Sequence, residues 1–177
     1  MAGLRRFSQA ISEGDGISVI VDVHTIDQAR AAQERGAEAI VLRGPVDGLD
    51  GATELPALFC GSKSPDEAVA AGADAILLRG LDDEELPGLH ARALELGLDC
   101  VIEVRDDEAL ERVLELVDPE ILLLTGEDAE AALELLPDVP AGKLAIADGR
   151  SATSDEIAEL ERAGVDAVLV GDAPPQV

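Results

Sequence analysis

Three short stretches of the sequence place a carboxylate and a cationic side chain two residues apart, each at the end of an apolar run. The pairs are Asp22 with His24, Glu103 with Arg105, and Asp148 with Arg150. Residues two apart on a β-strand point to the same face, so each pair can act on one ligand. Histidine titrates near neutral pH, so a carboxylate beside an imidazole can also transfer protons.

Three interpretations of these groups stay open. The first is an enzyme for an anionic substrate, with His24 as acid or base. In that case the candidate catalytic residues are Glu103, Asp148, Asp22 and His24. The second is a divalent cation held by the same hard oxygen donors and one imidazole. The third is a polar network without turnover, in which the acids pair with Arg43, Arg79 or Arg150. We predict no metal ion and no cofactor.

One sequence motif recurs in the elements that carry these residues. GAEAIVLRG (36–44) recurs as GADAILLRG (72–80) and, less closely, as GVDAVLVGD (164–172). In each copy the first glycine is predicted to end a helix, because glycine adopts the left-handed backbone conformation without penalty. The apolar run that follows does not alternate with polar residues, which is typical of parallel strands covered on both faces.

Eight such runs are predicted to be strands. They begin near Ser18, Ala39, Pro56, Ala75, Cys100, Glu120, Lys143 and Ala167. Helical patterns with N-terminal capping signals separate most of them. The predicted caps are Thr25, Ser64 before Pro65, Asp106 and Ser154. Alternating strands and helices predict a parallel sheet with right-handed crossovers.

We predict one domain over residues 1–177, an α/β miniature (β/α)8 TIM barrel of eight parallel strands. No dinucleotide-binding glycine motif follows the first strand, which favours a closed barrel over an open sheet. Barrels typically need about 200 residues or more, so helices must be shortened or lost. The second helix, between Gly44 and Pro56, is predicted to be reduced. The last is predicted to be missing, because Pro174 and Pro175 follow the eighth strand.

A missing last helix leaves the outer face of the eighth strand to be covered. A short N-terminal helix is predicted over residues 4–12, and its amphipathic segment from Leu4 to Ile11 is one candidate cover. A second copy of the chain is the other, which makes a homodimer covering this face the alternative prediction.

Composition limits the partners. The chain has 13 lysines and arginines against 38 acids, a formal net charge of −25. Such a field repels nucleic acid and anionic membranes, so neither is a predicted partner. No apolar run approaches the length of a membrane span or a signal peptide, which predicts a cytoplasmic protein. The spacing of Cys60 and Cys100 fits neither a disulfide framework nor a zinc site, so both are predicted to be buried apolar residues.

Three stretches also carry a family resemblance. They are LELGLDCVIEVRDDE (94–108), LAIADGRSATSDEIAELERAGVDAVLVGDA (144–173), and LPALF (55–59) followed by SPDEAVAAGADAILL (64–78). These resemble indole-3-glycerol phosphate synthase, a (β/α)8 barrel of tryptophan biosynthesis. The resemblance implies a lyase that closes an indole ring on a phosphorylated ribulose-type substrate, releasing carbon dioxide and water.

The resemblance implies a site that is only partly present. Glu103 matches the family's glutamate on the fifth strand. On the first strand, Asp22 stands in place of a glutamate and His24 in place of a lysine. On the third, Cys60 replaces the lysine that acts as an acid, and Lys63 lies three residues beyond it. A thiol is a poor acid there, and general acid catalysis contributes about 10² to 10⁴ in rate.

The last strands carry the other differences. Thr125 replaces an asparagine on the sixth strand, and Asp148, Gly149 and Arg150 replace Glu-Ser-Gly on the seventh. Barrels of this type bind phosphate with backbone N–H groups after strands seven and eight. The predicted phosphate-binding residues are therefore Gly149, Arg150 and Gly171, with Arg150 able to add a bidentate contact.

We therefore predict a diverged barrel of this family, with weak or no synthase activity, that still binds a phosphorylated small molecule. One alternative is an active lyase or isomerase of the phosphate-binding barrel superfamily, using Glu103, Asp148 and His24. The other is a non-catalytic barrel, natural or engineered, with a structural role.

Overall fold

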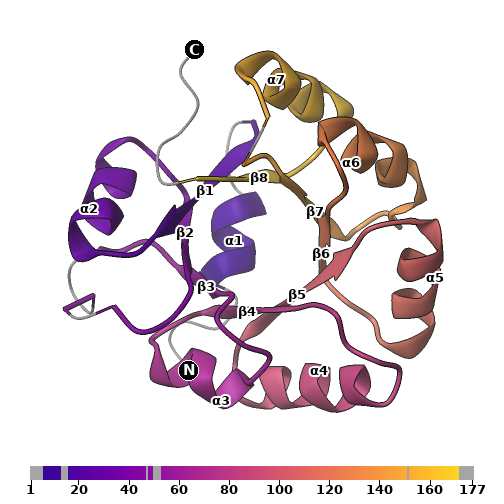
Figure 1. The fold of residues 1–177 in the computed structure, drawn as a ribbon, viewed down its shortest axis with the longest axis horizontal. Helices are drawn as coiled ribbons and strands as arrows, with labels where there is room; N and C mark the ends of the chain where they lie inside the picture. The colour runs from indigo at the N-terminus through magenta and orange to yellow at the C-terminus, as the bar shows by residue number, and fades with distance from the viewer. Residues whose placement is uncertain (1–5, 13–15, 47, 50–52, 151, 172–177) are drawn as a thin grey trace.

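The chain forms a closed ring of eight parallel strands in sequence order, and β8 pairs with β1 to complete it (Figure 1). The computed structural model describes residues 6–12, 16–46, 48–49, 53–150 and 152–171. The strands are β1 (Ser18–Val23), β2 (Ala39–Leu42), β3 (Ala57–Phe59), β4 (Ala75–Leu78), β5 (Asp99–Val104), β6 (Ile121–Leu124), β7 (Leu144–Asp148) and β8 (Ala167–Val170). The predicted fold class is confirmed, and every strand begins within one residue of its predicted start.

Helices cover the outside of the ring (Figure 1). They are α2 (Ile26–Glu34), α3 (Pro65–Ala70), α4 (Glu85–Glu95), α5 (Asp107–Leu116), α6 (Ala129–Leu135) with the 3-10 turn η1 (Leu136–Asp138), and α7 (Ser154–Ala163). The described residues between β2 and β3 contain no helix, and apolar side chains of this connection, Val46, Leu49 and Leu55, pack against the outer core instead. The predicted loss of the last helix concerns residues 172–177, which lie outside the described residues.

Three of the four predicted helix caps are confirmed. The side chains that cap α2, α3 and α5 are Thr25, Ser64 and Asp106. For α7 the prediction was one residue late, because Thr153 and not Ser154 is the cap. The Thr153 hydroxyl accepts a hydrogen bond from the Glu156 N–H, and the Glu156 carboxylate accepts one from the Thr153 N–H. This reciprocal capping box satisfies two N–H groups at once.

The repeated sequence motif has a structural role at the N-terminal ends of the strands. Its glycines, Gly36, Gly72 and Gly164, have φ angles of +86°, +84° and +102° and end α2, α3 and α7. Two residues on, each copy carries an acid that accepts a hydrogen bond from a backbone N–H of the preceding strand in the ring. These bonds join Glu38 to Val19 at 2.6 Å, Asp74 to Ala57 at 3.0 Å, and Asp166 to Ala145 at 2.8 Å. One motif thus ends a helix, links two neighbouring strands by a hydrogen bond and begins the next strand.

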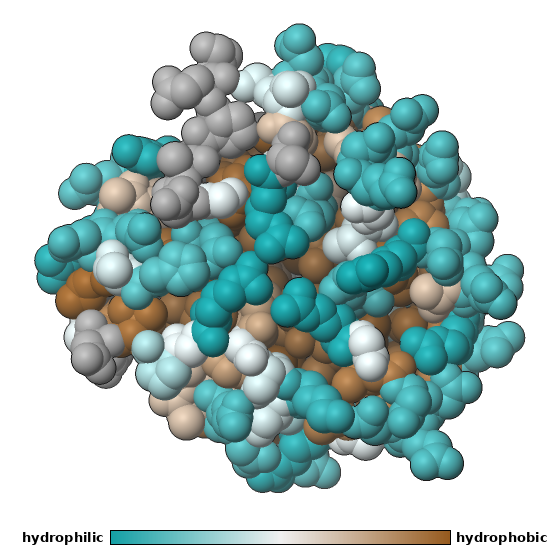
Figure 2. Space-filling model, in the orientation of Figure 1, coloured by the Kyte–Doolittle hydropathy of each residue, from teal (hydrophilic) through white to brown (hydrophobic). Residues whose placement is uncertain are grey.

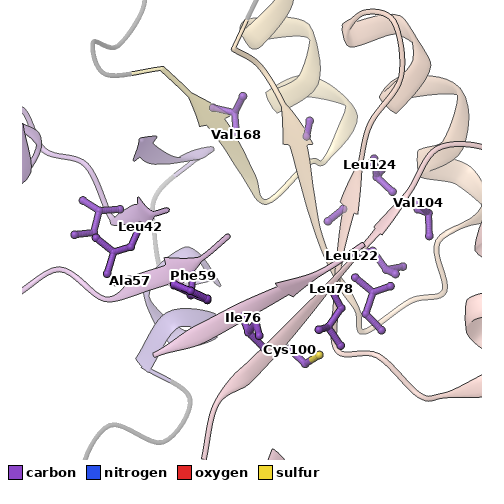
Figure 3. Close-up of a cluster of buried hydrophobic side chains, with 14 of the residues drawn as sticks. Leu42, Ala57, Phe59, Ile76, Leu78, Cys100, Val104, Leu122, Leu124 and Val168 are labelled. Atoms are coloured by element: carbon purple, nitrogen blue, oxygen red, sulfur yellow. The ribbon is translucent and has the colours of Figure 1, made fainter. Parts of the chain in front are cut away.

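Two apolar layers hold the barrel. The outer layer fills the space between strands and helices, and Figure 3 shows part of it, including Leu42, Phe59, Leu78 and Leu122. The inner layer fills the barrel with the alternate side chains of the same strands, such as Leu58 and Leu123. Because both faces of each strand are buried, the strands read as continuous apolar runs.

The N-terminal helix α1 (Arg6–Ser12) closes one end of the barrel. In Figure 1 it lies within the ring. Phe7 and Ile11 are 0% and 2% exposed and belong to the inner apolar layer. The Asp99 carboxylate accepts a hydrogen bond from the Ser8 N–H, and the Ser18 hydroxyl donates one to the Ile11 carbonyl. These bonds fix α1 to the N-terminal ends of β5 and β1.

The prediction that this segment covers the outer face of β8 is therefore wrong. The inner layer has small side chains on three even-numbered strands, Ala39, Ala75 and Ala167. We infer that these leave room for the large apolar face of α1 inside the ring. The outward-facing Val168 and Val170 of β8 are buried within one chain, and the homodimer stays a prediction. Residues 4 and 5 of the predicted helix lie outside the described residues.

No helix in the described part of the chain is both long and apolar enough to cross a membrane.

Candidate active site

A cavity of about 480 Å³ opens at the end of the barrel where the strands terminate. Figure 2 shows hydrophilic side chains gathered around a hollow over the centre of the ring, with apolar surface between them. Its apolar lining includes Leu77, Leu123 and Leu169 of the inner layer. Its charged lining includes Arg43, Arg79, Glu103, Arg105, Asp148 and Arg150. We call this hollow the central cavity.

Each acid that the sequence singled out is bonded to an arginine. Arg43 donates to Asp22 Oδ2 from Nε at 3.2 Å and from Nη2 at 3.0 Å. Arg150 binds both oxygens of Asp148, at 3.0 and 2.7 Å. The Glu103 side chain is 7% exposed, and its Oε1 accepts from Arg105 Nε and from the Thr125 hydroxyl, both at 3.1 Å. This arrangement agrees with the polar-network interpretation for Arg43 and Arg150.

The structure separates Asp22 and His24 from the other candidates. Neither lines the central cavity, and Asp22 lies beneath the guanidinium of Arg43. The His24 side chain is 59% exposed, with Nε2 3.9 Å from Asp22 Oδ1. His24 is therefore poorly placed to exchange a proton with a ligand in the cavity, whereas Glu103 and Asp148 are in its wall.

Cys60 lies in the wall of the cavity and is protonated at neutral pH. Burial raises the pKa of its thiol to about 11, against the opposing influence of nearby Arg43 and Arg79. A thiolate is the reactive form of cysteine, so Cys60 is neither a ready nucleophile nor an effective acid. Cys100 is also buried, as predicted, and burial raises its pKa to about 12.

The pair of Asp148 and Arg150 has a defined charge state. Burial tends to raise the pKa of Asp148, but hydrogen bonds from the Arg150 side chain and backbone outweigh it and lower the pKa below its ordinary value. The Asp148 hydrogen bonds in turn raise the pKa of Arg150. At neutral pH the pair is a carboxylate bound to a guanidinium.

This pair predicts a pH-dependent part of the stability. Because the folded-state pKa of Asp148 is lowered, its contribution is complete above the ordinary carboxyl pKa and is lost as the pH falls through the folded value. Both side chains reach solvent, so we expect about 1 kcal/mol or less. Urea unfolding from pH 7 to pH 3 should show that the gap between wild type and Asp148→Asn narrows on acidification. Arg150→Gln should remove the same pH-dependent part, and a gap that stays constant would contradict this assignment.

The predicted phosphate-binding residues are not equivalent. Arg150 lines the cavity. The Gly149 N–H donates to the Leu169 carbonyl at 2.7 Å, so it closes the β7–β8 seam and is not free to bind an anion. A side chain at Gly149 would also meet Val168 at 2.3 Å, which gives this glycine a packing role. Among the described residues, a Cβ at Gly171 would have no neighbour within 4 Å. Asp172 lies outside the described residues.

In the described part of the chain, no three His, Cys, Asp or Glu side chains are grouped so that they could hold a metal ion. The divalent-cation interpretation therefore lacks a donor set there, since Asp22, Glu103 and Asp148 each bind a different arginine.

Comparisons with known proteins agree with this architecture. Residues 62–174 match the family model described as indole-3-glycerol phosphate synthase. The indole-3-glycerol phosphate synthase of Geobacillus sp. (strain WCH70) is 31% identical in an alignment of 175 positions that covers 86% of this chain and 68% of that protein. The chain belongs to the indole-3-glycerol phosphate synthase family. The predicted family is thus confirmed.

Other relatives match over a shorter part. The indole-3-glycerol phosphate synthase of Variovorax paradoxus (strain S110) is 40% identical in an alignment of 115 positions that covers 60% of this chain and 43% of that protein. Among solved structures, phosphoenolpyruvate phosphomutase from Streptomyces platensis aligns with a TM-score of 0.74 at 15% identity, covering 92% of this chain and 78% of that one. That likeness concerns the fold alone.

Within this indole-3-glycerol phosphate synthase family member, no described lysine lines the central cavity. Lys63 is exposed and binds Glu85. Lys143 binds Asp118 at 2.7 Å, next to the N-terminal end of β7 and thus at the opposite end of the barrel. His90 on α4 is half-buried, and burial lowers the pKa of its imidazole.

Sequence reasoning missed two charged residues at this end of the barrel. Glu127 lines the central cavity, and its place just after β6 was an available signal. Arg112 lies inside α5 and lines a neighbouring hollow. Nothing in the helical pattern of α5 distinguishes Arg112 from an ordinary surface arginine.

Proposed function

We propose that this barrel binds a phosphorylated, anionic small molecule in the central cavity and has weak or no indole-3-glycerol phosphate synthase activity. The observation that carries the proposal is the lining itself. Four arginines, Arg43, Arg79, Arg105 and Arg150, line one cavity in a chain whose formal net charge is −25. Guanidinium groups bind phosphate and carboxylate with strong, charge-assisted hydrogen bonds.

The weak activity follows from what the cavity lacks. Family members are expected to use a lysine acid at the position of Cys60, and here a buried neutral thiol occupies that position. Protonation of a leaving hydroxyl needs a donor whose pKa lies near the working pH. Glu103 keeps the position of a family glutamate, but Arg105 and Thr125 already engage its Oε1.

The alternative of an active lyase or isomerase needs Glu103, Asp148 and His24 at one ligand. Only Glu103 and Asp148 line the cavity, so the geometry supports this alternative less well.

A direct assay of indole formation tests the activity. We expect the rate to lie about 10²-fold or more below that of a family member with the lysine acid, which is the typical size of one general-acid contribution. Rescue of a tryptophan auxotroph that lacks the synthase should fail. Normal turnover, abolished by Glu103→Gln, would show instead that this chain is an efficient synthase.

Thermal shift and calorimetry test the binding. Inorganic phosphate and a sugar phosphate should raise the melting temperature, because a ligand that binds only the folded state stabilises it. Arg150→Gln should weaken binding by about ten- to a hundredfold, the range expected for lost hydrogen bonds to a charged group. Arg30→Gln on α2 removes the same charge from an exposed side chain that pairs with Asp27, and should change nothing. Equal effects of both variants would point to a non-specific charge effect.

A further inference from the structure

A second hollow lies beside the central cavity, over the ends of β4 and β5 and the start of α5. Its volume is about 460 Å³, and its lining includes Arg79, Glu103, Arg105, Asp106 and Arg112. Arg79, Glu103 and Arg105 also line the central cavity, so these side chains form a shared wall. We call this second space the β4–β5 hollow.

The arginines of the β4–β5 hollow have N–H groups that make no hydrogen bond within the described residues. Within the described residues, Arg79 is exposed and has no ion pair. Arg105 gives only its Nε to Glu103. Arg112 uses Nη1 for Asp83 at 2.9 Å and Nη2 for the Leu81 carbonyl at 3.2 Å, which fixes its position and leaves Nε unused. A guanidinium carries five N–H donors, so all three retain donors for a ligand.

The acids of the hollow are more fully engaged than its cations. Asp106 Oδ1 accepts from the Ala109 N–H at 2.7 Å and caps α5. Glu103 accepts from Arg105 and Thr125. Three arginines thus line the hollow with two carboxylates that already have partners, and a third acid, Asp83, pairs with Arg112. The unused N–H donors of these guanidinium groups can form charge-assisted hydrogen bonds with a small anion.

We propose that the β4–β5 hollow is a second anion-binding subsite, which takes a phosphate or carboxylate group while the central cavity holds another. The proposal deepens the proposed function, since it makes the ligand a molecule with two anionic groups or two separate anions. Arg112 belongs only to the β4–β5 hollow and Arg150 only to the central cavity, so the two subsites can be tested separately.

Titration with inorganic phosphate at constant ionic strength, followed by amide NMR, tests the proposal. The amide of Ala109 reports on the β4–β5 hollow, and that of Gly126 on the central cavity. Both should shift with saturation in the wild type. Arg112→Gln should weaken the Ala109 response by about tenfold or more and leave the Gly126 response unchanged. Arg150→Gln should do the reverse.

A matched variant distinguishes a binding role of Arg112 from a purely structural one. Asp83→Asn removes the ion pair of Arg112 but keeps its guanidinium, so phosphate should bind the β4–β5 hollow at least as tightly as in the wild type. If Asp83→Asn weakens the Ala109 response as much as Arg112→Gln does, the arginine acts only by holding α5, and the proposal is wrong. If Gly126 shifts in the wild type and Ala109 does not, the second subsite is absent while the proposed function stands. If only Ala109 shifts, the proposed function fails and the subsite stands.

A series of linear alkane bisphosphates, compared with the monophosphates, identifies the source of the second anion. One ligand that spans both subsites should bind more tightly than its monophosphate at a matching chain length, because its second contact is intramolecular. That gain should vanish in both Arg112→Gln and Arg150→Gln. Separate anions should instead give no gain at any length, while both amides still respond to phosphate.

Discussion

Replacing Phe7 with alanine is expected to lower the free energy of unfolding by about 3–5 kcal/mol, the cost of truncating a buried aromatic side chain. Phe7 is fully buried inside the barrel, although it comes from a helix of only seven residues near the N-terminus. Its removal leaves a void in the inner apolar layer, to which Ile20 and Leu58 also belong. Chemical denaturation with urea measures the loss directly.

Leu94→Ala on α4 is the control for Phe7→Ala. Leu94 is 55% exposed, so its truncation should cost about 0.5 kcal/mol or less. Equal losses for the two variants would show that α1 does not close the barrel in solution. A large loss for Phe7→Ala alone would establish that α1 is part of the core.

Arg43→Gln is expected to destabilise the fold by about 1–3 kcal/mol, the penalty for leaving a buried charged acceptor without its donor. The Asp22 side chain is 13% exposed, and both hydrogen bonds that Arg43 donates to it reach Oδ2. Its Oδ1 is buried and has no hydrogen-bond partner among the described residues. Without Arg43, the side chain that the structure places near Asp22 as a possible donor is His24, whose Nε2 lies 3.9 Å from Asp22 Oδ1.

A double-mutant cycle with Asp22→Asn isolates this pair. An uncharged amide tolerates the loss of Arg43 better than a carboxylate does, so Arg43→Gln should cost less in the Asp22→Asn background. We expect a coupling of about 0.5–3 kcal/mol, measured by urea unfolding at pH 7. Additive losses would mean that Arg43 stabilises the barrel through its packing and not through Asp22.

The strands and most helix starts were predictable because their signals are local. A strand buried on both faces must be apolar throughout, and a helix must satisfy its first N–H groups with a nearby side chain. Thr25 and Asp106 therefore marked their helices correctly, while at α7 two adjacent hydroxyls competed and Glu156 selected Thr153. The position of α1 was mispredicted because its amphipathic pattern shows that one face is buried but not against which surface.

The candidate site was predictable only in its residue types. Carboxylates and arginines at strand ends indicated a polar barrel end, and Glu103, Asp148 and Arg150 do line the cavity. That Asp22 lies under Arg43, with His24 at the surface, depends on how neighbouring strands are offset in the ring. The hydrogen bond from the Gly149 N–H to the adjacent strand depends on the same offset.

By itself, the sequence determined the order of strands and helices, the closed barrel they form, and the family to which the chain belongs. These follow from apolar runs, capping residues and glycines, whose effects act within a few residues of the chain. The tertiary structure alone decided that α1 closes the barrel and that Arg112 of α5 and Arg79, the residue after β4, line the same second hollow. These residues are far apart in sequence, and only the curvature and register of the closed ring bring them together.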